Sequence, residues 1–193
     1  MLWGVLRSVI KKTFFHPRSD LGKRVEFENQ LLYYQHIEKR RIVYIDESGF
    51  AQDTARGYGY SYRGSRCYGI KDWHNKGRGN AIGAILDFKM INVGLFETNI
   101  NADVFHAWVT QQLLCCLDEK TVIVMDNATF HKRNDTIYAI GKSGHRILFL
   151  PPYSPDLNPI EKKWAQAKSI RKKLRCDPYI LFENYVNWQN ILS

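Results

Sequence analysis

The sequence contains few of the residues and patterns that mark several common protein classes. Only four of its 193 residues are cysteines, and none forms a C-x-x-C pair or lies at zinc-like spacing from histidines. We interpret Cys67, Cys115, Cys116 and Cys176 as reduced thiols of a cytoplasmic protein, with one of the adjacent pair facing the core. No apolar run approaches about eighteen residues, so we expect no membrane-spanning segment. The sequence contains no P-loop and no Ser-His-Asp pattern, which argues against an NTPase and against a serine hydrolase.

Acidic residues are also scarce relative to basic ones. Lys and Arg together number 28 and Asp and Glu number 19, which gives a net charge of +9. A surplus of this size favours an anionic partner, with nucleic acid first, although basic proteins without such a partner are common. The remaining composition, 45% hydrophobic and 24% charged, is typical of a globular protein with a sizeable core.

The chain divides into a short leading segment and one larger domain. Residues 1–38 are basic and then helical, with Phe27, Leu31 and Tyr34 spaced along one helix face. The segment is too short for an independent domain, so we interpret it as a linker and a lead-in helix. Residues 39–193 form the predicted main domain.

Within the main domain the periodicity changes from strands to an alternation of strands and helices. A short strand, 42–45, ends at Asp46, and Asn101 is a predicted helix cap. This order predicts an α/β fold in which helices cover a mixed sheet. Strands are expected within 57–70, 79–98, 120–126 and 145–150, and helices within 101–117, 134–144, 158–174 and 178–193.

Two predicted strands end in aspartate, in the stretches "VYID" and "IVMD". Open α/β sheets bind ligands at the carboxyl ends of their strands, so Asp46 and Asp126 are candidate site residues. Because side chains alternate along a strand, Glu47 points away from Asp46, and we assign Asp46 to the site. Two desolvated carboxylates stay ionised only beside a positive charge, and a hard divalent cation such as Mg²⁺ suits oxygen ligands.

A third carboxylate follows a stiff loop in "FLPPYSPDLNPIEKKW". Four prolines restrict the backbone there, and Asn158 is a predicted cap for the helix that presents Glu161 in its first turn. We expect the loop to bring Glu161 to the two aspartates. The alternatives remain open that the aspartates are turn formers or helix caps and that Glu161 only complements the helix dipole. The prolines are Pro151, Pro152, Pro155 and Pro159.

The stretches "YIDESGF", "VMDNATFHK" and "LPPYSPDLNPIEKKWAQAK" resemble the three signature blocks of DDE transposases of the mariner superfamily, especially its bacterial insertion-sequence branch. Thirty-four residues separate Asp126 from Glu161, as in one large group of that superfamily, and the resemblance covers about residues 39–175. It implies a ribonuclease-H-like fold, a five-stranded mixed sheet flanked by helices on both faces. It also places Asp46, Asp126 and Glu161 on a catalytic triad that binds Mg²⁺ or Mn²⁺, two ions in all, and leaves the role of Asn127 open.

The implied activity is metal-dependent DNA strand cleavage and strand transfer during transposition. The implied partners are double-stranded DNA, as transposon ends and target, and either a second copy of the chain or an upstream helix-turn-helix product. The resemblance makes residues 39–193 the DDE catalytic domain and residues 1–38 the remnant of an amino-terminal DNA-binding region, with its linker and lead-in helix. Only about forty residues precede Asp46, so the chain resembles a truncated transposase or the downstream half of a split reading frame in a bacterial cytoplasm. Two alternatives are a non-catalytic remnant that binds DNA or a transposase subunit, and another metal nuclease of this fold, such as an RNA–DNA hybrid hydrolase.

Basic residues supply a predicted DNA track. One group lies on the predicted helix 158–174, whose inner stripe is Ile160, Trp164, Ala167 and Leu174. The other lies in the aromatic stretch after residue 57. The alternatives to DNA binding are a solvated helix face for the first group and an ordinary hairpin for the second. The candidate DNA-binding residues are Arg63, Arg66, Lys71, His131, Lys162, Lys163, Lys168 and Arg171.

Overall fold

The computed structural model describes residues 17–51, 60–68 and 78–185 of the chain. Its strands are β1 (Arg41–Ala51), β2 (Arg78–Leu86), β3 (Lys89–Phe96), β4 (Thr121–Met125) and β5 (Arg146–Phe149). Its α-helices are α1 (Leu21–His36), α2 (Ala102–Trp108), α3 (Asn134–Lys142), α4 (Ile160–Leu174) and α5 (Pro178–Tyr185). Among the described residues, no helix is long and apolar enough to cross a membrane.

The five strands form one mixed sheet in the order β3-β2-β1-β4-β5. The first three strands form an antiparallel meander, and β4 and β5 run parallel to the central strand β1. The turn between β2 and β3 consists of Asp87 and Phe88, whose φ values of 49° and 62° are those of a tight two-residue hairpin. The predicted five-stranded mixed sheet is therefore confirmed.

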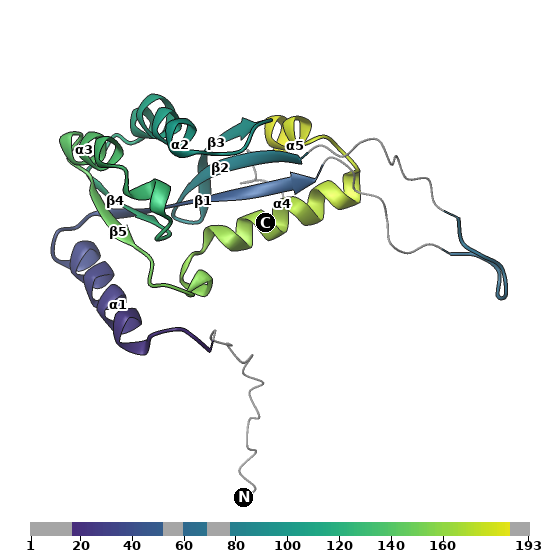
Figure 1. Cartoon of the computed structure of the whole chain (residues 1–193), viewed down its shortest axis with the longest axis horizontal. Coiled ribbons are helices and arrows are strands. Elements are labelled where there is room, and N and C mark those ends of the chain that lie inside the picture. Colours follow the sequence, from purple (N-terminus) through teal and green to yellow (C-terminus); the bar gives the residue numbers. More distant parts are fainter. Residues whose placement is uncertain (1–16, 52–59, 69–77, 186–193) are drawn as a thin grey trace, which may run out of the picture.

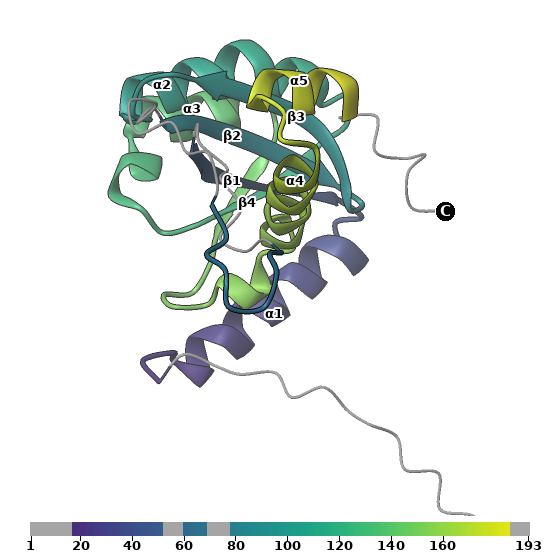
Figure 2. The same cartoon turned by 90° about the vertical axis from the view of Figure 1, so that its right-hand side faces the viewer.

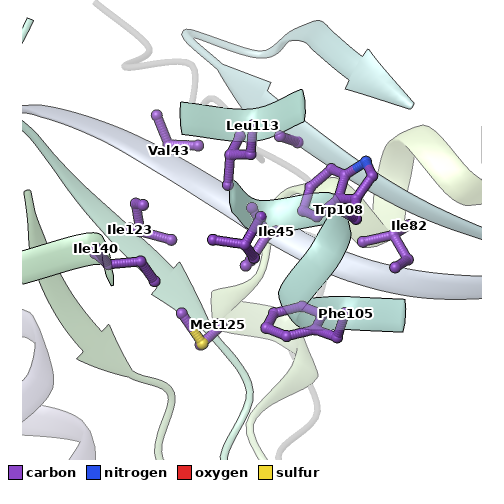
Figure 3. Close-up of a cluster of buried hydrophobic side chains, with 11 residues drawn as sticks. Val43, Ile45, Ile82, Phe105, Trp108, Leu113, Ile123, Met125 and Ile140 are labelled. Atoms are coloured by element: carbon purple, nitrogen blue, oxygen red, sulfur yellow. The ribbon is translucent and has the colours of Figure 1, made fainter. Parts of the chain in front are cut away.

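The sheet lies between two layers of helices (Figures 1 and 2). Helices α2 and α3 cover one face, and α1 and α4 cover the other. On the α2 side the core contains Val43, Ile45, Phe105, Trp108 and Ile123, all at most 1% exposed (Figure 3). Val43 and Ile45 of β1 point into this core, so Tyr44 and Asp46 point to the other face, which α1 and α4 cover, as the alternation of a strand requires.

The helix after Asn101 differs from the prediction. Asn101 caps α2 as expected, since its side chain accepts a hydrogen bond from the Val104 amide at 2.9 Å. The chain then passes through a π-helical turn, 109–113, and a 3-10 turn, 114–116. These turns change the residues per turn and carry Cys115 and Cys116 to the outside, where both are exposed. The prediction that one of them faces the core is therefore wrong.

Helix α1 packs on the sheet as part of the same fold. Asp20 caps it, and Phe27, 4% exposed, joins a core with residues of β1, β4 and β5. Arg24 also forms a two-pronged contact with Asp156 in the proline-rich loop, with N–O distances of 3.0 and 2.5 Å. The sequence predicts a helix here, and its buried face packs directly on the sheet. The division of the chain at residue 38 stays a prediction.

One stretch predicted as strand is a loop where the structure describes it. Residues 60–68 contain a turn closed by a 2.9 Å hydrogen bond from the Ser65 amide to the Tyr62 carbonyl, and no strand. Arg63 and Arg66 are exposed there. Lys71 lies outside the described residues.

Candidate active site

The three predicted carboxylates line one pocket of about 450 Å³. It opens between the sheet, the proline-rich loop and the start of α4. Asn127, Ala128 and Leu150 line its sheet side, and residues 151–155 and Asn158 line its loop side. Asp46, Asp126 and Glu161 complete the lining, so the predicted convergence of residues 46, 126 and 161 on one pocket is confirmed.

The parallel register of β1 and β4 brings the two aspartates together. Their last paired residues are Tyr44 and Val124, and extending that register by two residues aligns Asp46 with Asp126. The prediction that the strand ends at Asp46 is wrong, because β2 pairs with β1 as far as Ala51. Asp46 nevertheless lies beyond the end of β4, where no residue of β4 pairs with it, so its side chain lies at the open edge of the sheet.

A tryptophan from α4 holds the Asp46 carboxylate. The Trp164 indole donates a 3.1 Å hydrogen bond from Nε1 to Oδ2 of Asp46. Trp164 is 1% exposed and makes edge-to-face contacts with Phe50 and Phe182. Gly83 faces Asp46 across the β1–β2 pair, and its missing side chain provides the space that the indole occupies. The packing of α4 on the sheet therefore determines the position of Asp46.

We expect Gly83→Ala to destabilise the fold by about 1–3 kcal/mol, the usual cost of overpacking a core. An alanine Cβ at this position would lie 2.5 Å from Cη2 and 2.8 Å from Cζ2 of Trp164, so the indole must shift. Urea denaturation measures the loss. The control is Gly79→Ala in the same strand, where the nearest atom would be 4.0 Å away. Equal losses for the two variants would contradict this account of the indole site.

The electrostatic environment raises the pKa of Asp46 to about 7. Burial is the largest cause, and the nearby charges of Glu47 and Glu161 add to it, with a smaller contribution from Asp126. A carboxyl group with a pKa this high lacks a cationic partner in the protein. Its surroundings favour either a proton or a bound cation.

Asp126 has the opposite environment, because a buried histidine contacts it. His131 is 1% exposed, and its Nδ1 lies 2.7 Å from Oδ1 of Asp126. Its Nε2 lies 2.8 Å from Oε1 of Glu47. Burial alone lowers the pKa of His131, but its hydrogen bonds to Asp126 and Glu47 outweigh burial and raise it to about 9. The hydrogen bond from His131 is also the main reason that the pKa of Asp126 is lowered.

Glu161 lies on the first turn of α4 and is exposed. The loop before it is well packed, since Pro151, Ser154 and Asn158 are buried. The backbone of Tyr153 adopts a left-handed conformation with φ 57°, which marks a strained turn inside this loop. The loop thus carries Glu161 from the end of β5 to the rim of the pocket, as predicted.

The predicted capping role of Asn158 is wrong, because α4 has no side-chain capping hydrogen bond. The Oδ1 atom of Asn158 is instead buried and lacks a hydrogen-bond partner, alone among the buried side-chain nitrogen and oxygen atoms of the described residues. Buried polar groups are almost always paired, so an orphaned oxygen in a functional pocket calls for an explanation. Asn158 lines the same pocket as the three carboxylates.

The three carboxylates do not form a closed ligand set. Within the described part of the chain, no group of three or more His, Cys, Asp or Glu side chains lies close enough to hold a metal ion. Like charges repel each other, which is consistent with the raised pKa of Asp46. Assignment of Asp46, Asp126 and Glu161 as metal ligands therefore stays a prediction.

The predicted DNA-binding residues have different environments. On α4, Lys162 and Lys168 are exposed, Lys163 is half-buried, and the Lys168 ammonium lies 5.7 Å from the centre of the Phe50 ring. Arg171 is only 4% exposed and donates from Nε to the Cys176 carbonyl, so its predicted DNA contact is wrong.

The inner face of α4 explains this correction. Ile160, Trp164, Ala167 and Arg171 follow the helical spacing into the protein, whereas Leu174, predicted to be buried, is 45% exposed. The predicted DNA contact of His131 is also wrong, because both of its ring nitrogens contact carboxylates inside the fold.

Comparisons with known proteins agree with this architecture. The sequence model of a family described as DDE superfamily endonuclease matches residues 41–177. A comparison with curated protein sequences found no match. Among solved structures, a Mos1 transposase paired-end complex with left transposon end is 18% identical with a TM-score of 0.65, and the match covers 97% of this chain and 60% of that chain.

Two further Mos1 structures are similar to this chain over most of its length. A mariner Mos1 paired-end complex with Mg is 17% identical with a TM-score of 0.67, covering 97% of this chain and 61% of that chain. The catalytic domain of Mos1 mariner transposase is 15% identical with a TM-score of 0.61, covering 95% and 86%. The chain spans about 60% of the length of the Mos1 chains in the DNA-end complexes. At such identities the likeness shows the fold, which is ribonuclease-H-like, as in the Mos1 catalytic domain.

The family model covers the sheet strands β1 to β5, the proline-rich loop and α4, and so includes all three pocket carboxylates. The chain therefore belongs to the DDE superfamily endonuclease family.

Proposed function

We propose that this chain is a transposase catalytic domain that cleaves DNA strands and joins them to a target with the help of divalent cations. The observation that carries the proposal is the convergence of Asp46, Asp126 and Glu161 on one pocket. The family assignment supports a nuclease, and the complexes of Mos1 with transposon ends support DNA as the substrate. The block "LPPYSPDLNPIEKKW" supports the bacterial insertion-sequence branch.

The residues of the pocket fit a divalent cation. Carboxylate and carboxamide oxygens are the ligands that Mg²⁺ and Mn²⁺ prefer, and the pocket provides both kinds. The raised pKa of Asp46, which burial and neighbouring carboxylates cause, and the unpaired buried oxygen of Asn158 both support a cation in this pocket. When bound, two such ions would supply an activated water or 3′-hydroxyl and a stabilised leaving oxygen.

The protein's own residues have positioning roles in this chemistry. Trp164 holds Oδ2 of Asp46, and both donors to the Asp126 carboxylate, the Ala128 amide and His131, lie at Oδ1. Oδ2 of Asp126 therefore receives neither of these two hydrogen bonds and is available to a ligand in the pocket. Among the described residues, no hydrogen bond or ion pair holds the exposed Glu161 side chain, so it can turn toward a ligand at low cost. Exposed lysines of α4, such as Lys162 and Lys168, would bind the DNA backbone beside the pocket.

Relaxation of supercoiled plasmid tests the proposal without knowledge of the transposon ends. We expect the purified chain to nick plasmid in Mn²⁺ or Mg²⁺ and not in a chelator, and Asp126→Asn to abolish nicking. A duplex with a free 3′-hydroxyl, incubated with the same plasmid, tests strand transfer. If Asp126→Asn keeps the wild-type rate, the assigned site is wrong. DNA binding without any nicking would support the non-catalytic alternative instead. Pairing with a second copy or with a helix-turn-helix product stays a prediction.

A further inference from the structure

Glu47 is the sequence neighbour of the pocket residue Asp46, but its side chain does not line the pocket. It follows Asp46 on β1 and points to the opposite face of the sheet, toward α2. Its carboxylate nevertheless reaches the site indirectly, because His131 lies between Glu47 and Asp126. The result is a carboxylate–imidazole–carboxylate link that passes around the end of β4, from one face of the sheet to the other.

The histidine at the centre of the link is shielded from water and closely packed. The His131 ring lies 4.3 Å from the Phe105 ring and 4.2 Å from the Phe130 ring, centre to centre. His131 itself belongs to the short 3-10 turn Thr129–Lys132, which begins three residues after Asp126. The Glu47 side chain is only 19% exposed. Glu47 is therefore held by packing as well as by its hydrogen bond, whereas the Asp126 side chain, 51% exposed, opens onto the pocket.

The contacts fall on one oxygen of Asp126. His131 Nδ1 and the Ala128 amide, which donates at 2.9 Å, both approach Oδ1. Two donors on the same oxygen fix the rotation of the carboxylate and leave Oδ2 without a contact among the described residues. Such an arrangement presents one defined oxygen to a ligand in the pocket.

Stability alone is a poor reason for such a link. Buried ion pairs often contribute little net stability, because burial of each charge costs about as much as the attraction returns. An apolar residue at position 131 could fill the space between Phe105 and Phe130 without that cost. The link is better explained by the exact orientation that it gives to Asp126.

We propose that Glu47 and His131 are positioning residues that orient Asp126 for cation binding, an inference that rests on the proposed function. Neither residue contacts the substrate or the ion. Ligand-orienting partners of this kind typically contribute a factor of about 10 to 100 in metal affinity.

Titration of Mn²⁺ into the full chain by calorimetry tests the proposal without measuring catalysis. His131→Phe keeps the aromatic packing and removes both nitrogens, and we expect Mn²⁺ affinity to fall by about 10- to 100-fold. Glu47→Gln keeps an acceptor for Nε2, and we expect it to lose less affinity than Glu47→Ala, which has none. Ile140→Ala is the control, because it opens a cavity in the same core without touching the link.

The outcomes separate this inference from the proposed function. If His131→Phe binds Mn²⁺ as tightly as wild type while Asp126→Asn does not bind, the link serves packing only and the proposed function stands. If wild type binds no Mn²⁺, both are overturned. If Mn²⁺ affinity falls as much in Ile140→Ala as in His131→Phe, the inference is also contradicted, because lost stability alone would then explain the weaker binding.

Discussion

Asp46→Asn is expected to slow DNA cleavage by about a thousandfold and, without divalent cations, to make the fold more stable at neutral pH. The first effect follows from the loss of one cation-binding carboxylate in the proposed site. The second follows from the pKa of Asp46, which burial and the charges of Glu47 and Glu161 raise to about 7. An asparagine can still accept the Trp164 hydrogen bond and carries no charge.

The sign of the pH dependence is fixed by this raised pKa. Between about pH 4 and 7 the folded protein holds a proton at Asp46 that the unfolded chain has released, so wild-type stability falls as the pH rises through this range. Asp46→Asn does not lose stability in this way, because asparagine does not release a proton in this pH range. Its advantage over wild type should therefore grow from about pH 4 to 7 and stay constant above that.

Urea denaturation in a chelator at several pH values measures the stability difference, and plasmid nicking in Mn²⁺ measures the rate. Asp118→Asn is the matched control, since it makes the same change at an exposed carboxylate that does not line the pocket. It should leave both quantities close to wild type. A stability difference for Asp46→Asn that does not vary with pH would contradict the raised pKa, and unchanged nicking would contradict the site.

Trp164→Ala is expected to cost about 3–5 kcal/mol of folding free energy, a large share of the stability of a small domain. The indole is buried among Phe50 and Phe182 and fills the space above Gly83. Trp164→Phe keeps much of this packing but removes the donor to Asp46. It should therefore lose less stability than the alanine variant and still weaken Mn²⁺ binding.

Trp108 provides the control for this pair of effects. It is equally buried and lies in the core on the opposite face of the sheet (Figure 3). Its indole donates to Asn92 at 3.0 Å rather than to a pocket residue. Trp108→Phe should lose stability by a similar amount as Trp164→Phe and keep wild-type Mn²⁺ affinity. The role of Trp164 in positioning Asp46 is refuted if both variants bind Mn²⁺ equally well.

The parts of the site that depend on local patterns could be predicted from the sequence. Asp46 and Asp126 follow short apolar runs typical of buried strands, and a parallel pair of such strands aligns them. Glu161 follows a proline-rich loop that leads into a helix. Each of these features is visible within a dozen residues, and the pocket results from how they combine.

The features that the sequence did not reveal depend on contacts between distant residues. Glu47 and His131 are 84 positions apart, and no local pattern pairs them. Arg171 looked like one more basic residue of α4, yet its place on the inner face makes it buried. The π-helical turn after α2 changed the face of Cys115, because one extra residue in a turn shifts every later position.

An anomalous-scattering map of crystals grown with Mn²⁺ would show whether the three carboxylates share bound cations. We expect a Mn²⁺ peak in the pocket, with carboxylate oxygens of Asp46 and Asp126 about 2–2.5 Å away and Glu161 turned toward the bound ions. Peaks only at other acidic residues, or an empty pocket at a Mn²⁺ concentration that supports nicking, would contradict it.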